Sequence, residues 1–238
     1  MGLAHRVIPV LLARDGNLVK GKKFDSSRVV GNVQQAAEIH QARGVDELLI
    51  LDVGATPAGR GPDFTAMARL TERCFMPVSV GGGVSEVWHV RELLANGADK
   101  VVIGAAARGS PGLIQQCTTR FGGQAIVVAI HLRGWHGELA AQFARHITRV
   151  AGAGEILITS VQRDGTLRGY DIPVVRAVAA AVDVPVIANG GAGSYLHMHH
   201  ALAAGASAVA AGAMFQWLDL TPLGAAEYLA RRGWEVRL

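Results

Sequence analysis

The chain has 238 residues, of which 50% are hydrophobic and 18% are charged, and its formal net charge is +4. This composition is typical of a globular protein with one sizeable core, and it excludes a disordered chain. The positive charge forms no Lys/Arg stripe with interleaved aromatics, so we expect anionic metabolites and no nucleic acid as partners. Because no apolar run could span a membrane and the N-terminus lacks a signal-peptide pattern, we expect no membrane partner and a cytoplasmic location.

Cysteine and histidine residues give no sign of a metal site. Cys74 and Cys117 are too few and too far apart for a disulfide framework or a Cys-rich site, and we expect them to be buried free thiols. His197, His199 and His200 fall on one predicted helix, but an outer helix offers no further ligands. We therefore expect neither a metal ion nor a cofactor.

Short runs rich in Val, Ile and Leu recur along the chain and predict buried parallel strands. They span residues 6–12, 47–53, 77–80, 100–104, 125–131, 155–161, 185–189 and 208–212. Amphipathic helical patterns lie between most of them, as at 33–43, 87–96, 113–121, 172–182 and 223–231. Eight strands that alternate with helices predict a closed parallel sheet, which is a single (β/α)8 (TIM) barrel domain over residues 1–238.

The chain also repeats itself at an offset of about 108 residues. GVDELLILDV falls on GAGEILITSV, PVSVGGG falls on PVIANGG, and ADKVVIGA falls on ASAVAAGA, with no gap needed. Self-similarity at a fixed offset indicates repeated structural units. We predict two similar half-barrels, at about residues 1–122 and 123–238.

Glycine-containing loops follow four of the predicted strands, two in each half. They contain Gly82, Gly83, Gly104, Ala105, Gly190, Gly191, Gly212 and Ala213. Glycine lets backbone N–H groups approach phosphate oxygens, and a following helix N-terminus favours the negative charge. Two such sites across one barrel mouth would suit a small molecule with a phosphate at each end. The same glycines could instead serve only tight strand-to-helix turns.

Four further residues are candidates for catalysis at the strand C-termini. Asp164 follows the sixth strand, Asp52 closes the second, His131 ends the fifth, and Lys20 lies in the loop after the first. A carboxylate or an imidazole there could move protons, and Lys20 could bind an anion. Each of these residues also has a structural explanation: Asp164 could cap a turn, His131 could be a core histidine, and Lys20 could be solvated. Gly165, which follows Asp164, is a further candidate for the phosphate loops.

Charged residues begin four of the strands, at the end opposite to the glycine loops. Arg6, Glu47, Lys100 and Glu155 alternate in sign, and we predict a salt-bridged ring across the bottom of the barrel. On physical grounds alone such a ring is a feature of stability.

The chain resembles the HisF family, the cyclase subunit of imidazole glycerol phosphate synthase, in the segments RVIPVLL, DGNLVKG, DELLILD, VSVGGG, ADKVVIGAA, AIVVAI, GAGEILITS, QRDGT, RGYD and IANGGAG. The resemblance covers nearly the whole chain. It implies a glutaminase partner, HisH, whose ammonia enters at the barrel bottom and reacts at the top with a bis-phosphorylated ribulosyl substrate. It also implies that the four-residue ring is an ammonia gate and that Asp99 lies at the glutaminase interface.

The catalytic end departs from the family pattern. The resemblance implies acid–base aspartates at the ends of strands 1 and 5, where this chain has Leu12 and His131. Leucine cannot transfer a proton, so the ordinary two-carboxylate mechanism cannot operate. Gly104-Ala105 replaces the usual Asn-Thr, and Ala213 replaces a serine, so the phosphate sites would rely on backbone N–H groups. The segment between His131 and Glu155 is also shorter, and most of a loop that helps to close over substrate is missing.

Three hypotheses follow from this combination. The first is a HisF-like subunit that conducts ammonia from a HisH-like glutaminase to a phosphorylated substrate or partner enzyme in a secondary pathway, such as amidation of surface sugars. The second is the histidine-pathway cyclase, with His131, Asp52 and Lys20 sharing the proton transfers. The third is a non-catalytic barrel that binds a phosphosugar. We favour the first because the gate is intact while the aspartate pair is missing.

Overall fold

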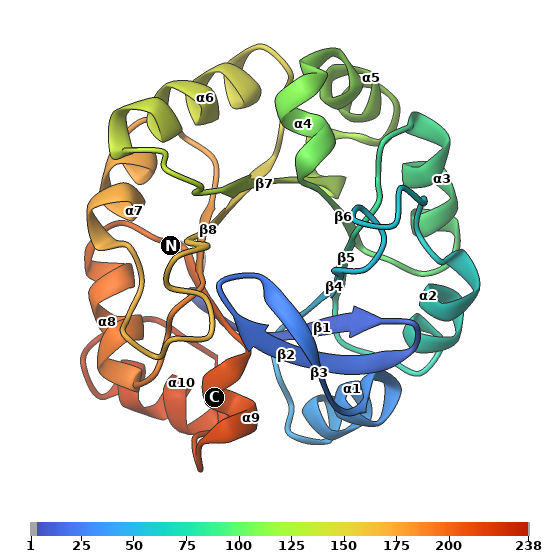
Figure 1. The fold of residues 1–238 in the computed structure, drawn as a ribbon. Coiled ribbons are helices and arrows are strands. Elements are labelled where there is room, and N and C mark those ends of the chain that lie inside the picture. Colours follow the sequence, from blue (N-terminus) through green and yellow to red (C-terminus); the bar gives the residue numbers. More distant parts are fainter. Residues whose placement is uncertain (1–3, 238) are drawn as a thin grey trace.

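A computed structural model describes residues 4–237 of the chain as a closed barrel surrounded by helices (Figure 1). The barrel strands are β1 (Arg6–Arg14), β4 (Leu48–Asp52), β5 (Val78–Gly81), β6 (Lys100–Ile103), β7 (Ile126–His131), β8 (Glu155–Thr159), β9 (Val186–Asn189) and β10 (Ala208–Ala211). Each pairs in parallel with its neighbours, and β10 pairs with β1 to close the sheet. The predicted (β/α)8 barrel is confirmed.

The loop predicted after the first strand is in fact a hairpin. β1 extends to Arg14, and β2 (Asn17–Lys22) and β3 (Asp25–Asn32) follow as antiparallel strands added to it. In Figure 1 the hairpin lies in blue beside the barrel opening. Its strands escaped prediction because β2 pairs with β1 only at Ala13 and Arg14, and its buried stretch, Leu18, Val19 and Lys20, is too short to indicate a barrel strand.

Helices cover the outer face of the sheet. They are α1 (Val33–Ala42), α2 (Phe64–Thr71), α3 (Val87–Ala95), α4 (Ala105–Gly109), α5 (Pro111–Phe121), α6 (Gly137–Arg149), α7 (Ile172–Ala179), α8 (Tyr195–Ala203), α9 (Ala213–Trp217) and α10 (Pro222–Ala230), with one 3-10 turn at Gly123–Ala125. No helix within residues 4–237 is long and apolar enough to cross a membrane.

Local capping residues fix where several helices begin. The Asn32 side chain accepts hydrogen bonds from the N–H groups of Gln34 and Gln35 at 2.9 and 3.1 Å, and Asp63 does the same for Ala66 at 2.9 Å. Such caps satisfy N–H groups that have no partner within the helix. Side-chain caps therefore define the first residue of α1 and α2.

Side chains alternate along each strand between two cores. In β1, Ile8 and Val10 point into the barrel, while Val7 and Leu11 point outward against the helices. The two-residue period of a β-strand produces this division. The inner cluster contains Ile8, Val10, Leu49, Val102, Val127, Ala129, Leu157, Ile187, Ala208 and Ala210. Of the two predicted buried thiols, Cys117 is buried and Cys74 is only partly so.

Elements of the two predicted halves match at an offset of 108 residues. α2 and α7, β5 and β9, α3 and α8, β6 and β10, and α4 and α9 each have the same length and begin 108 residues apart. The register between the halves therefore extends through consecutive elements, which supports the half-barrel interpretation.

The inner core makes a prediction about stability. Leu157 on β8 is 1% exposed, and we expect Leu157→Ala to lower the free energy of unfolding by about 2–4 kcal/mol because it leaves a cavity in the barrel. Denaturant unfolding measures the change. Leu196→Ala is the control, since Leu196 is 44% exposed, and we expect about 0.5 kcal/mol or less there. Equal losses at the two positions would contradict the inward orientation of Leu157.

Candidate functional site

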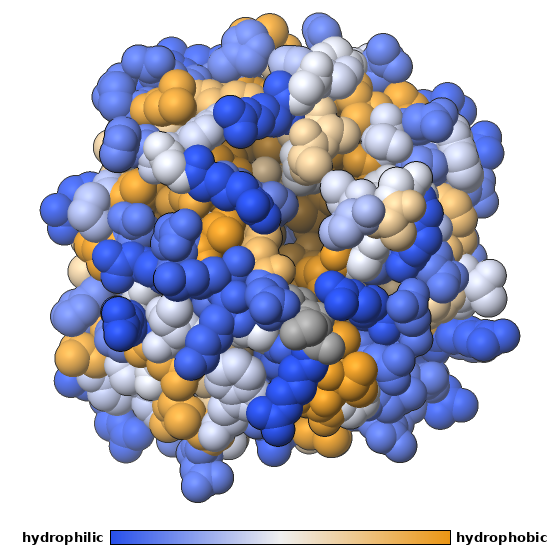
Figure 2. Space-filling view, in the orientation of Figure 1, coloured by the Kyte–Doolittle hydropathy of each residue, from blue (hydrophilic) through white to orange (hydrophobic). Residues whose placement is uncertain are grey.

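The carboxyl ends of the barrel strands meet at one opening, which we call the mouth. Figure 2 shows hydrophilic residues around it and hydrophobic residues in the central hollow. Leu12 and Leu51 pack on the inner apolar cluster at this end. Thr159 and Asn189 lie level with His131 in the sheet register, and Asn189 donates a hydrogen bond to Thr159 Oγ1 at 3.1 Å. The floor of the mouth is therefore apolar on one side and polar on the other.

His131 ends β7 and is partly buried beneath the hairpin. Its ring meets the edge of Phe24 with the centroids 5.1 Å apart and the planes at 83°. The Arg133 guanidinium lies 5.6 Å from the same Phe24 ring. Burial, with a smaller effect from the charge of Arg133, lowers the His131 pKa to about 4. The imidazole is therefore neutral near pH 7 and has a free nitrogen lone pair to accept a proton.

Lys20 lies on β2, and not in a loop as the sequence suggested. Its side chain is buried, so the alternative that it is merely solvated is wrong. Only 3% of it is exposed, and its ammonium lies so close to Gly212 that a side chain at that position would collide with it. Burial lowers the Lys20 pKa to about 8, although the charge of Asp164 opposes the shift. The structure thus places a cation next to one predicted phosphate loop.

Asp164 and Gly165 hold the hairpin down over the mouth. The Lys23 N–H donates to the Asp164 carbonyl at 2.9 Å, and Gly165 packs against the Gly21 backbone with a φ of +68°. Burial raises the Asp164 pKa, while Lys20 and the Phe24 N–H oppose that change. Gly165 thus has a packing role that a larger side chain could not fill. Asp164 lies both in a turn and at the mouth, so its two interpretations, as a turn residue and as a catalytic residue, both remain predictions.

Asp52 is engaged by its own loop. Its Oδ1 accepts from the N–H groups of Gly54 and Ala55 at 2.9 and 3.1 Å, and its Oδ2 pairs with Arg60 Nη1 at 2.8 Å. The structure therefore gives Asp52 a clear role in shaping the loop after β4. Sequence reasoning missed Arg60, because nothing local marks it as the partner of a residue on the preceding strand.

Both glycines of the first pair in each half have a positive φ. Gly83 and Gly191 have φ values of +69° and +106°, which favour glycine over other residues. A β-carbon on Gly83 would stand 2.6 Å from the Arg60 carbonyl oxygen, and one on Gly191 would collide with that of Gly169. The Gly169 N–H also donates to the Gly191 carbonyl at 2.7 Å. Two consecutive loops are therefore in backbone contact in each half.

Gly104-Ala105 and Gly212-Ala213 open the short helices α4 and α9. Neither helix has a side-chain cap, so the first N–H groups are not taken by a capping oxygen. The structure brings each of these loops to the same opening as the first glycine pairs, because all four follow barrel strands at their carboxyl ends. Backbone N–H groups facing one opening can bind anions.

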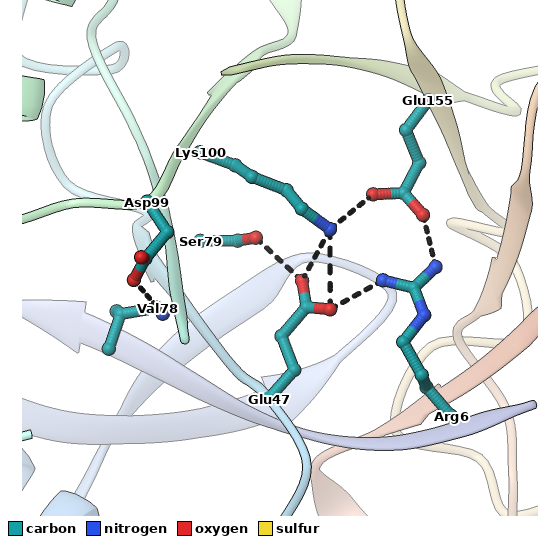
Figure 3. A network of polar contacts seen from close by, with 7 residues as sticks. All are labelled: Arg6, Glu47, Val78, Ser79, Asp99, Lys100 and Glu155. Atoms are coloured by element: carbon teal, nitrogen blue, oxygen red, sulfur yellow. Dashed lines mark hydrogen bonds and ion pairs between the residues drawn. The ribbon is translucent and has the colours of Figure 1, made fainter. Parts of the chain in front are cut away.

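The opposite end of the barrel holds a closed ring of ion pairs (Figure 3). Arg6 pairs with Glu47 at 2.5 Å and with Glu155, and Lys100 pairs with Glu47 at 3.3 Å and with Glu155 at 2.9 Å. Both carboxylates are buried, and both cations are partly exposed. Burial alone would lower the Arg6 pKa, but the charges of Glu155 and Glu47 outweigh it and raise the pKa. The ring thus lies where the sequence predicted it.

Two further polar residues, Ser79 and Asp99, lie at this end of the barrel. Ser79, which sequence reasoning missed, donates to Glu47 Oε1 at 2.8 Å and so occupies an oxygen that faces away from Arg6. Asp99 is exposed at the same end, and its Oδ2 accepts from the Val78 N–H at 2.8 Å, which ties the starts of β5 and β6 together. Asp99 therefore has a structural bond in addition to any contact with a partner. Within residues 4–237 no cluster of three or more His, Cys, Asp or Glu side chains is arranged to hold a metal ion.

This architecture defines a (β/α)8 barrel with glycine loops at its mouth and a salt-bridged ring at its bottom. The family described as "Histidine biosynthesis protein" matches residues 6–219. The chain is 43% identical to imidazole glycerol phosphate synthase subunit HisF of Hyphomonas neptunium, and the match covers 99% of both proteins. It is 42% identical to the subunit of the same name from Caulobacter vibrioides, over 99% of this chain and 97% of that protein. The chain belongs to the HisF family.

Both alignments are longer than the chain, at 250 and 253 positions against 238 residues. These relatives therefore contain residues that this chain lacks. The shorter segment expected between β7 and β8 fits that difference.

The bottom ring makes a second prediction. We expect Glu155→Gln to lower the free energy of unfolding by about 3 kcal/mol or more, because it leaves Arg6 and Lys100 facing a single buried carboxylate. Denaturant unfolding at low salt measures the loss. Glu38→Gln is the matched control, since Glu38 pairs with Arg73 at the surface and we expect at most about 1 kcal/mol. Similar small losses in both variants would show that the ring contributes little.

The lowered pKa of His131 makes a third prediction. Because its folded-state pKa of about 4 lies below the ordinary 6.5, the unfolded chain takes up a proton that the folded chain does not. Stability should therefore fall as the pH drops from about 6.5 to about 4. We expect Phe24→Ala to raise the His131 pKa by exposing the ring, as measured by NMR titration of the imidazole. Val30→Ala, at an exposed position on β3, should leave it unchanged.

Proposed function

We propose that this chain is the barrel subunit of a glutamine-dependent ammonia-transfer enzyme of the imidazole glycerol phosphate synthase type. The observation that carries the proposal is the closed ring of Arg6, Glu47, Lys100 and Glu155 beneath an apolar barrel interior that opens into a mouth with glycine loops. Neutral ammonia can enter an apolar passage, whereas an ammonium ion would have to leave water at high cost. The ring would admit ammonia when a partner binds at the bottom.

The proposed partner is a HisH-like glutaminase, bound at the end that carries Asp99 and the ring. Asp99 is exposed there and lies next to Lys100 in the chain. The relatives' name, a subunit of a synthase, supports an assembly of more than one chain. Ammonia released by hydrolysis of glutamine would then reach the ring without passing through bulk water.

The proposed substrate is a small molecule with a phosphate at each end. Gly82-Gly83 with Gly104-Ala105 would bind one phosphate, and Gly190-Gly191 with Gly212-Ala213 would bind the other. Lys20 strengthens the second site, because its ammonium is buried directly beside Gly212. The loops provide backbone N–H groups where related proteins would use side chains.

Proton transfer would fall to His131 and Lys20, whose pKa values are lowered to about 4 and about 8. Neutral His131 can accept a proton from the substrate, and Lys20 with a pKa of about 8 can donate one near neutral pH. Asp164 would keep Lys20 oriented and partly charged. Asp52, bound within its own loop, would act through Arg60 and the shape of the mouth.

The comparisons favour the histidine-pathway cyclase over the secondary-pathway subunit that the sequence led us to prefer, since both relatives are named for imidazole glycerol phosphate synthase. One observation still favours the secondary pathway: Leu12 extends the apolar interior to the mouth, at a strand end where an acid–base group is expected. In that case the barrel would deliver ammonia to another enzyme.

Genetic complementation separates these two functions. We expect the gene, together with a compatible glutaminase gene, to restore growth without histidine to a strain that lacks the cyclase. We also expect His131→Ala to abolish that growth, because it removes the proposed base.

The control variant Leu12→Asp/His131→Asp places carboxylates at both strand ends. Growth with this variant but not with the natural chain would overturn the cyclase function and support the secondary pathway. If neither version grows and the purified protein binds phosphate without any ammonia-dependent reaction, the barrel is a non-catalytic binding protein.

A further inference from the structure

The mouth glycine loops are held by two histidines that none of the functions above uses. His89 lies on α3 and His197 on α8, and the two positions differ by the same 108 residues as the repeat. We propose that His89 and His197 are positioning residues, one for each phosphate loop, which hold the backbone N–H groups in the geometry that binds phosphate.

His197 links α8 to the loop after β9. Its Nδ1 accepts a hydrogen bond from the Gly193 N–H at 3.1 Å, while its own N–H donates to the Ser194 hydroxyl at 3.3 Å. This is a reciprocal cap, in which a side chain in the first helical turn reaches back to the backbone before the helix. Gly193 is only two residues beyond Gly191, so the bond fixes the far end of the glycine loop.

His89 makes the equivalent contact in the first half. Its Nδ1 accepts from the Ser85 N–H at 3.2 Å, and Ser85 lies two residues beyond Gly83. Phe64 and Trp88 pack around the His89 ring, with centroids 5.9 and 4.2 Å away. The ring can therefore neither rotate freely nor leave the loop without disturbing these aromatic contacts.

Each histidine ring also contacts the preceding loop. Atoms of His89 lie 3.1 Å from the place where a β-carbon on Gly61 would stand, and His197 lies 3.2 Å from the same place on Gly169. Gly61 and Gly169 belong to the loops that contact Gly83 and Gly191. Each histidine ring thus bonds to one glycine loop and fills the space beside the loop that precedes it in the chain. Both loops of each half are held in register, which limits the backbone freedom that their glycines would otherwise have.

The hydrogen bonds require the neutral ring. Burial is the main reason that the pKa values of both His89 and His197 are lowered, which favours neutral imidazole. In each ring the Nδ1 that accepts carries no proton, so the proton is on Nε2.

This inference rests on the proposed phosphate loops, and one experiment tests both. The protein is labelled with ¹⁵N-glycine, and inorganic phosphate is titrated while the signals of Gly82, Gly83, Gly190 and Gly191 are followed by NMR. The variants are Asn, whose Oδ1 can replace the Nδ1 acceptor, and Phe, which keeps a ring but has no acceptor.

We expect His197→Phe to weaken phosphate binding about tenfold at Gly190 and Gly191 and to leave Gly82 and Gly83 unchanged. His89→Phe should do the reverse. His197→Asn and His89→Asn should bind like the natural protein to within about threefold, since they keep the acceptor. His200→Phe, an exposed position on α8, should change neither site.

Other outcomes overturn one claim or both. If natural protein binds phosphate and the Phe variants bind equally well, or lose both sites together, the histidines do not position the loops. If phosphate shifts none of the four glycine signals in the natural protein, the proposed phosphate loops fail and the inference fails with them. If a Phe variant does not fold, the Asn variant at the same position decides the question. Loss of phosphate binding at the glycines of that half in the Asn variant would contradict the acceptor role.

Discussion

The pairing of β10 with β1 is the constraint on which the rest of the structure depends. Once the parallel sheet closes, each strand must direct alternate side chains into a space with no outlet except the two ends. All carboxyl ends then meet at one opening and all amino ends at the other. The glycine loops gather at the mouth, and the strand-initial charges gather at the bottom, because of closure and not because of any local signal.

The two ends of the barrel differ in how their titratable groups are compensated for burial. At the bottom, Glu47 and Glu155 each face both Arg6 and Lys100, so burial is offset by two opposite charges. At the mouth, His131 has no carboxylate among the groups that shift its pKa, and its pKa falls to about 4. The bottom therefore pairs its buried charges with one another, while burial at the mouth favours the neutral form of His131. An apolar interior between these ends suits the passage of an uncharged molecule.

The sequence predicted the barrel because buried parallel strands consist of apolar runs, and the glycine loops because they follow those runs directly. It could not predict the hairpin β2 and β3, because only three consecutive residues of β2 are buried and they include the charged Lys20. Nor could it find Arg60, Ser79 or Asn189, since each meets a partner on another strand or loop. The repeat could have pointed to His89 and His197, because the two positions coincide at the 108-residue offset.

The sequence by itself determined the order and number of the barrel strands, the internal repeat, and the residue types at each strand end. These properties are local, since they depend on apolar periodicity and on the conformational freedom of glycine. Only the tertiary structure decided that Lys20 is buried beside Gly212, that Asp52 is bound within its loop, and that His131 is neutral. Those outcomes depend on contacts between residues far apart in the chain, which form only when the barrel closes.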